Sequence, residues 1–185
     1  MTPTFIQAIP WEPRRAAQAR HLSEVTNGTV VWDTTHHAFD TWRSVLTTIG
    51  NSAAIILEDD VIVCDDWRTK VEAVIREYPE VVIQFFSMRG DDLTVGSRWQ
   101  AGRTFLMNQC YYLPEGAAKA LLEYTQDWAQ RHPEHPTGYD VAMAEWLKVT
   151  KQKYWTHVPS LVQHQPWRSE INPRRPRNRQ SRTFA

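Results

Sequence analysis

The chain has 185 residues, with 21 basic and 21 acidic side chains, so its formal net charge is zero. Its hydrophobic fraction of 42% and charged fraction of 23% are ordinary for a soluble globular protein. Two cysteines are too few for a disulfide framework, and no apolar run approaches the ~20 residues that span a bilayer. No signal peptide is evident, so we expect a cytoplasmic protein, in the host cytoplasm if a phage encodes it.

Strands and helices alternate in the first third of the chain. Apolar runs predict strands at 4–9, 29–32 and 53–57, and helical stripes predict helices at 14–25 and 39–49. Such alternation is typical of a parallel sheet. We therefore predict one Rossmann-type α/β domain with a mainly parallel central sheet flanked by helices.

The rest of the chain continues this pattern less regularly. We predict helices at 67–78, from 114 through 128, and at 139–149, and strands at 81–86, 104–106, 109–113 and 153–157. The polar stretch 87–104 reads equally as a lid and as an ordinary surface connection. We place the domain at residues 1–165 and an Arg/Pro-rich tail, with six arginines, at 166–185.

Three consecutive carboxylates, Glu58, Asp59 and Asp60, directly follow the predicted strand 53–57. Adjacent buried carboxylates repel one another unless a cation or hydrogen-bond donors compensate. Mg²⁺ and Mn²⁺ prefer oxygen ligands, and ligands bind at the carboxyl ends of strands in open α/β sheets. The cluster therefore predicts a metal–phosphate site, with an exposed acidic turn as the alternative. No glycine-rich phosphate loop is present, which favours a metal over a backbone cradle.

The segment Ile-Leu-Glu-Asp-Asp-Val resembles the acidic signature of GT-A glycosyltransferases, especially small bacterial and phage enzymes and the lipooligosaccharide galactosyltransferase type. Two later segments resemble elements of the same family: Gln109 to Leu122, and Pro-Ser-Leu-Val-Gln-His ending at His164. The resemblance implies a GT-A-like fold. It also implies a metal-dependent transferase that takes a sugar from a nucleotide-sugar donor, most simply a UDP-sugar, with Mn²⁺ or Mg²⁺.

The resemblance also assigns roles. Asp60 and His164 would bind the metal, and Glu58 and Asp59 would hold ribose, sugar or metal-bound water. Asp140, in a Thr-Gly-Tyr-Asp segment, would accept the proton of the acceptor hydroxyl in an inverting enzyme; capping a helix is its plainer role.

Two further residues are candidates for contacts to the nucleobase or the phosphates. Asp33 follows the strand predicted at 29–32, and Arg43 belongs to the helix predicted at 39–49.

The sequence does not identify the acceptor of the sugar. The Arg-rich tail favours a hydroxymethylated base in phage DNA, with protein or glycan acceptors as alternatives. A non-catalytic nucleic-acid-binding module derived from a glycosyltransferase is the main rival, and a metal-dependent nuclease or phosphohydrolase fits the carboxylates only. The sequence does not indicate the sugar, the stereochemistry or the oligomeric state.

Overall fold

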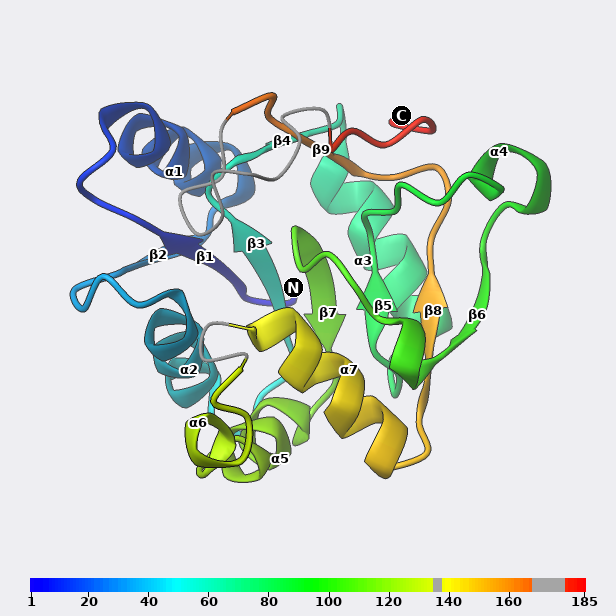
Figure 1. Cartoon of the computed structure of the whole chain (residues 1–185). Helices are drawn as coiled ribbons and strands as arrows, with labels where there is room; N and C mark the ends of the chain where they lie inside the picture. The colour runs from blue at the N-terminus through cyan, green and yellow to red at the C-terminus, as the bar shows by residue number, and fades with distance from the viewer. Residues whose placement is uncertain (135–137, 168–178) are drawn as a thin grey trace.

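The structure is a computed structural model that describes residues 1–134, 138–167 and 179–185. Within these residues, seven strands form one sheet in the order β2-β1-β3-β7-β5-β8-β6 (Figure 1). The strands are β1 (Thr4–Ala8), β2 (Thr29–Trp32), β3 (Ala54–Glu58), β5 (Ile83–Gln84), β6 (Arg98–Ala101), β7 (Cys110–Leu113) and β8 (Lys153–Thr156).

Five of these seven strands run in the same direction. β1, β2 and β3 are mutually parallel, β7 is antiparallel to both β3 and β5, β8 is parallel to β5, and β6 is antiparallel to β8. The predicted α/β class with a mainly parallel central sheet flanked by helices is therefore confirmed. A separate two-stranded sheet joins β4 (Val61–Val63) to β9 (Val162–His164).

Helices cover both faces of the sheet. One face carries α1 and α3, and the other carries α2, α5, α6 and α7. Their bounds, with those of two short helices in the connection before β7, are α1 (Pro13–Thr26), α2 (Ala38–Ile49), α3 (Trp67–Glu77), α4 (Asp92–Val95), η1 (Gly102–Thr104), α5 (Ala117–Tyr124), α6 (Trp128–Arg131) and α7 (Tyr139–Val149). None of the helices in the described residues is long and apolar enough to cross a membrane.

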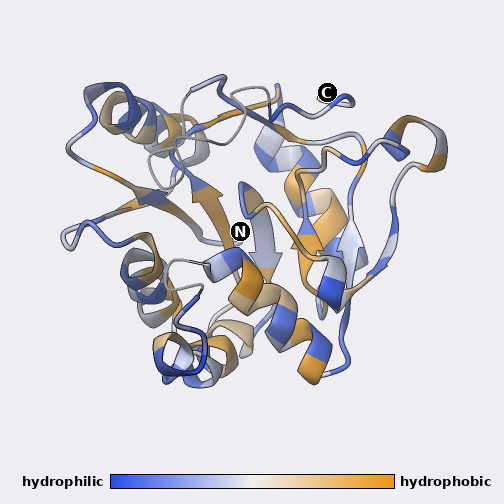
Figure 2. Ribbon diagram, viewed as in Figure 1, coloured by the Kyte–Doolittle hydropathy of each residue, from blue (hydrophilic) through white to orange (hydrophobic). Residues whose placement is uncertain are grey.

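The period-2 pattern of the strands divides the core between the two faces. In β3, Ile56 packs against the face of α2 and α7, whereas Ile55 and Leu57 pack against the face of α1 and α3. Figure 2 shows the hydrophobic character of β3 and the mixed character of the helices around it. The first four residues of β3 are apolar and buried, and the acidic cluster begins at its last residue, Glu58.

Several predicted boundaries were wrong. The apolar run 81–86 forms only the two-residue strand β5, and of residues 104–106 the first ends η1 and the other two follow it without forming a strand. The predicted helix from 114 through 128 is two helices, α5 and α6, and the stretch 87–104 contains α4 and the edge strand β6.

The C-terminal residues 179–185 lie against the small sheet. Ser181 N donates to Gln163 Oε1 at 2.8 Å, and Ser181 Oγ donates to Ser160 Oγ at 2.8 Å. Most of the predicted Arg-rich tail, residues 168–178, lies outside the described residues. The division of the chain at residue 165 therefore stays a prediction.

Candidate active site

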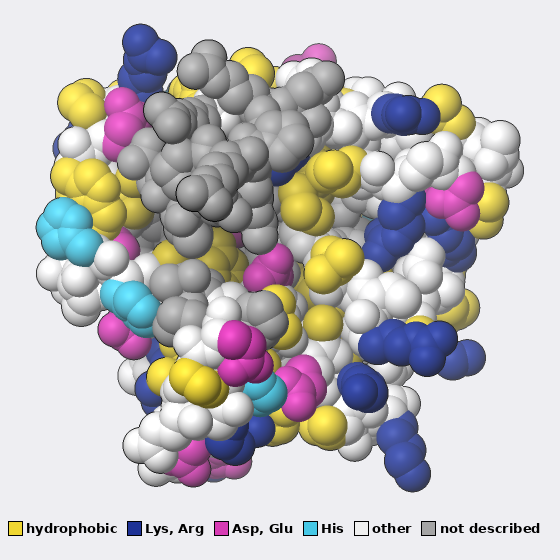
Figure 3. Space-filling model, viewed as in Figure 1, with side chains coloured by type: hydrophobic (Ala, Val, Ile, Leu, Met, Phe, Trp, Pro, Cys, Tyr) yellow, Lys and Arg dark blue, Asp and Glu magenta, His cyan; other side chains and the backbone are white. Residues whose placement is uncertain are grey.

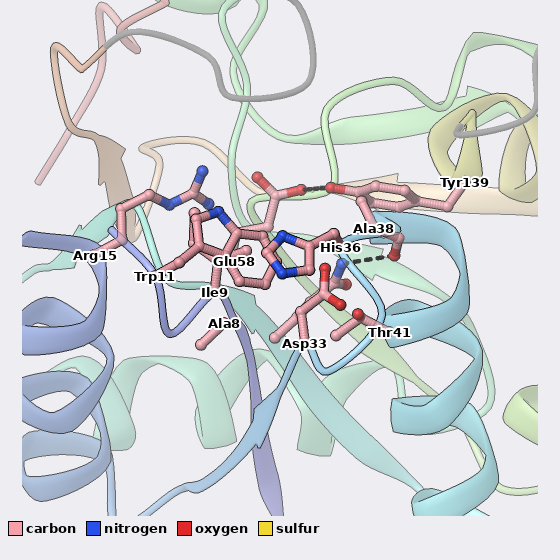
Figure 4. A pocket seen from close by; sticks show the side chains of 11 residues that line it. Ala8, Ile9, Trp11, Arg15, Asp33, His36, Ala38, Thr41, Glu58 and Tyr139 are labelled. Carbon is pink, nitrogen blue, oxygen red and sulfur yellow. Dashed lines mark hydrogen bonds between the residues drawn. The ribbon is translucent and has the colours of Figure 1, made fainter. Parts of the chain in front are cut away.

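A pocket of about 370 Å³ opens at the carboxyl ends of β1, β2 and β3. Because these three strands are parallel and adjacent, the residues that follow them meet at one edge of the sheet. Figure 4 shows the side chains that line it, which come from these strand ends and from α1, α2 and α7: Gln7, Ala8, Ile9, Trp11, Arg15, Asp33, His36, Ala38, Thr41, Glu58 and Tyr139.

Asp59 is the inner member of the acidic cluster, and its side chain is fully buried. Its Oδ2 accepts a hydrogen bond from Ile9 N at 2.8 Å, and its Oδ1 accepts from Arg15 Nε at 2.8 Å and forms an ion pair with Arg15 Nη2. Burial raises the pKa of Asp59 to about 6, although Arg15 opposes this shift. Both carboxylate oxygens are thus used inside the protein, and the predicted contact of Asp59 with a donor stays a prediction.

Asp60 and His164 lie together, as the resemblance implies. The pairing of β4 with β9 sets Val61 opposite His164, and His164 Nε2 lies 3.3 Å from Asp60 Oδ2. Burial would raise the pKa of Asp60, but the charges of Arg15 and His164 outweigh it and hold that pKa well below its usual range. Asp60 Oδ1 and His164 Nδ1 are buried and have no hydrogen-bond partner among the described residues, and the 3.3 Å contact of His164 Nε2 with Asp60 lacks hydrogen-bond geometry.

Such unpartnered buried atoms are expensive to desolvate, so they fit a ligand that completes them. A carboxylate oxygen and an imidazole nitrogen suit Mn²⁺, and the pair therefore fits the predicted metal. Within residues 1–134, 138–167 and 179–185, however, no group of three or more His, Cys, Asp or Glu side chains is arranged as a metal site. The remaining ligands would have to come from a substrate or water.

Glu58 faces the pocket from the end of β3. Its Oε1 accepts a hydrogen bond of 2.5 Å from the Tyr139 hydroxyl, and its Oε2 accepts one of 3.3 Å from Gln109 Nε2. Burial, with the adjacent charge of Asp60, raises the pKa of Glu58 to about 7. The sequence analysis did not predict Tyr139 as a site residue, although it precedes the predicted Asp140. The available signal was an aromatic hydroxyl at the start of that helix.

The other wall of the pocket is aromatic and polar. Trp11 and His36 stack with ring centroids 3.8 Å apart and an interplanar angle of 22°. Asp33 Oδ1 accepts from Thr35 N at 2.8 Å and from Thr35 Oγ1 at 3.1 Å. Burial would raise the pKa of Asp33, but these hydrogen bonds and one from Thr41 lower it overall, so Asp33 faces the pocket as a carboxylate.

Of the seven predicted site residues only Asp33 and Glu58 line the pocket; Asp59, Asp60 and His164 lie behind Arg15, and Arg43 and Asp140 lie elsewhere. Arg43 lies on α2 and is half-buried, and its Nε has no partner within the described structure. Asp140 lies in the first turn of α7, where its Oδ1 accepts from Val141 N at 3.0 Å. The roles assigned to these two residues stay predictions.

No protein-family model matches the chain, and no curated protein matches it. Among solved structures, it is similar to a Bacillus anthracis protein described as a glucose-1-phosphate thymidylyltransferase, crystallised in complex with sucrose. The identity is 11%, the TM-score is 0.50, and the alignment covers 89% of each chain. At this identity the likeness concerns the fold alone, and it agrees with the strand order above: the chain has a Rossmann-like α/β fold.

Proposed function

We propose that the chain is a metal-dependent glycosyltransferase that uses a nucleotide sugar, most simply a UDP-sugar. The observation that carries this proposal is the pair Asp60 and His164, whose buried polar atoms lack partners beside a pocket at the carboxyl edge of the sheet. A structural role would not require unpartnered atoms in both side chains. The similarity to a sugar-nucleotide enzyme's fold is compatible with the proposal.

The pocket offers a distinct surface for each part of the donor. The Trp11–His36 stack would support the nucleobase, and Asp33 would accept from a ribose hydroxyl. Glu58, held by Tyr139, would orient the sugar. Asp60 and His164 would hold Mn²⁺ or Mg²⁺, which when bound neutralises charge on the departing diphosphate.

The acceptor side of the proposal rests on fewer contacts. Asp140 would take the proton of the acceptor hydroxyl if the enzyme inverts configuration. Its helix starts beside the pocket, because its neighbour Tyr139 lines it. Arg43 would contact a phosphate only after a movement that brings it into the pocket, which its present position on α2 does not provide.

A hydroxymethylated base in DNA is the acceptor that we propose first, with protein and glycan acceptors as alternatives. On the face shown in Figure 3, basic side chains gather at the lower right, by the end of α7 distant from the pocket. The Arg-rich tail would supply the contacts to the DNA phosphates. Deleting residues 168–185 should abolish salt-sensitive DNA binding, because phosphate contacts release counterions. Unchanged DNA binding in the truncated protein would contradict this acceptor.

The first test is donor binding by calorimetry and thermal shift. Nucleoside diphosphates and their sugars would be titrated with and without Mn²⁺ into the wild type and Asp60→Ala. We expect metal-dependent binding of one nucleotide, lost in the variant. If no nucleotide binds, the transferase is excluded and the non-catalytic nucleic-acid-binding module becomes the better account.

The fold similarity favours a second candidate, nucleotidyl transfer to a sugar phosphate, as the neighbour's name describes. Incubation with a nucleoside triphosphate and glucose-1-phosphate distinguishes the two activities. Release of pyrophosphate would identify the nucleotidyltransferase, whereas slow release of free sugar from a nucleotide sugar would identify the glycosyltransferase.

A further inference from the structure

Arg15 occupies the centre of the acidic cluster. It lies in the first turns of α1, where Glu12 Oε2 accepts from its backbone N at 2.8 Å. Its guanidinium donates to Asp59 Oδ1 from Nε at 2.8 Å, and its Nη2 also lies 3.5 Å from Asp60 Oδ2. Its side chain is only 14% exposed. A fixed positive charge thus lies between the two carboxylates nearest to the proposed metal site.

This charge opposes a metal ion that arrives alone. Asp59 and Asp60 carry two negative charges when ionised, and Arg15 cancels one of them. His164 and the guanidinium of Arg179 also act on Asp60 by their charges, although less strongly than Arg15. A divalent cation without other ligands would therefore meet a site with little net negative charge and a guanidinium beside one of its ligands.

A diphosphate reverses this balance. Arg15 lines the pocket, as Figure 4 shows, and no hydrogen bond from its Nη1 is present in the described part of the chain. The guanidinium can therefore donate from Nη1 to a phosphate oxygen while its Nε still donates to Asp59. A diphosphate adds negative charge between Arg15 and the metal, so the two cations no longer repel each other without compensation.

We propose that Arg15 is a resident counter-cation that makes divalent metal binding conditional on a nucleoside diphosphate in the pocket. The inference rests on the proposed function, because it assumes that Asp60 and His164 bind the metal. It assigns to this chain an order of binding in which the metal enters with the diphosphate or after it.

The test is Mn²⁺ binding, followed by electron paramagnetic resonance of free Mn²⁺, with and without UDP. The wild type should bind Mn²⁺ alone weakly, and UDP should tighten that binding. Arg15→Gln should bind Mn²⁺ alone about tenfold more tightly, because a unit positive charge is removed from the site. Arg15→Lys keeps the charge and should behave as the wild type. Unchanged or weaker Mn²⁺ binding in R15Q would overturn the inference.

Removing Arg15 leaves the buried Asp59 without its counter-ion, so R15Q risks misfolding. The comparison of Asp59→Asn with the double variant R15Q/D59N avoids this problem, because the two proteins differ only in Arg15. The double variant should bind Mn²⁺ alone about tenfold more tightly than D59N. Equal affinities would overturn the inference whatever happens to R15Q.

The result also separates this inference from the proposed function. If the wild type binds no Mn²⁺ with any nucleoside diphosphate, the proposed function fails and the inference fails with it. If Mn²⁺ and UDP bind together in all variants, but removal of Arg15 does not strengthen binding of Mn²⁺ alone, only the role of Arg15 is refuted.

Discussion

Two arginines, Arg15 and Arg89, organise polar groups inside this protein, and they do so differently. Arg89 Nη1 donates to Gln84 Oε1 at 3.3 Å and to Ser87 Oγ at 3.1 Å, and its Nη2 donates to Thr104 O at 2.9 Å and to Tyr154 Oη at 2.6 Å. Around Arg15, by contrast, buried atoms of the neighbouring Asp60 and of His164 have no partner within the described residues.

The difference separates structure from function. We call the Arg89 network closed, because both of its Nη atoms donate to neutral protein acceptors. Its guanidinium links the connection before β7 to the sheet. The cluster at Arg15 is open, because Asp60 Oδ1 and His164 Nδ1 beside it have no hydrogen-bond partner among the described residues. Because partly satisfied polar networks destabilise a fold, an open one is retained where a ligand completes it.

The strongest test of this comparison is Arg89→Met, which should lower the free energy of unfolding by about 3 kcal/mol. The substitution leaves the buried Gln84 Oε1 without its donor and removes one of the two donors to the Thr104 carbonyl, the other being the Tyr154 hydroxyl. Urea unfolding measures the change, and Arg103→Met, at an exposed position, is the control and should shift stability by less than about 0.5 kcal/mol. A loss below about 1 kcal/mol for R89M would show that the closed network is not structural.

His164→Gln should have the opposite profile. Stability should fall by less than in R89M, because His164 loses only its 3.3 Å contact with Asp60 and its Nδ1 has no hydrogen-bond partner among the described residues. The affinity for Mn²⁺ in the presence of UDP should fall on the order of 100-fold, and that for Mg²⁺ by less, because imidazole suits Mn²⁺ better. His157→Gln, at a position that precedes β9 in the sequence, is the matched control and should leave both affinities unchanged. Equal losses in the two variants would argue against His164 as a ligand.

The open site should also cost stability at neutral pH. The pKa of Glu58 is raised from 4.5 to about 7, so between these values the folded state holds a proton that the unfolded state releases. Stability therefore falls as pH rises through this window. Glu58→Gln removes the effect: in metal-free buffer it should raise the free energy of unfolding on the order of 2 kcal/mol at pH 8 and hardly at pH 5.

Chemical denaturation at the two pH values measures this difference. Glu24→Gln, at an exposed position on α1, is the control for the lost charge and should change neither value. A gain that is the same at pH 5 and pH 8 would refute the explanation from the raised pKa.

Periodicity carried the prediction of the first half of the fold. The stripe of Phe39, Trp42, Val45, Leu46 and Ile49 forms the buried face of α2, and the runs at β1 to β3 became parallel strands. These features depend on local spacing alone. The same spacing failed at 81–86, where only Ile83 and Gln84 pair with β7 and β8, because an apolar run shows burial but not which of its residues pair with neighbouring strands.

Part of the candidate site was also predictable from the sequence. Asp33 and Glu58 to Asp60 were placed at the carboxyl edge because they directly follow strands, and the proximity of His164 to Asp60 came from the family resemblance. Arg15 and Tyr139 were not predicted, since they reach the acidic cluster across 44 and 81 residues of sequence through packing of α1 and α7. An arginine in a helix's first turns carries no local sign of such a role.

The smallest effect is expected at the rim of the open site. Trp11 is 39% exposed and stacks on His36, so its ring is held in place before any ligand binds. Stacking of a base on an aromatic ring contributes about 1–3 kcal/mol, so Trp11→Ala should weaken UDP binding about tenfold, whereas Trp11→Phe should retain most of it. Inorganic pyrophosphate, which lacks a base, should bind the wild type and W11A equally, as calorimetry would show. If W11A lost affinity for UDP and for pyrophosphate equally, the stack would support the phosphate side of the pocket. The pocket would then not be divided into an aromatic wall for the nucleoside and a charged wall for the diphosphate.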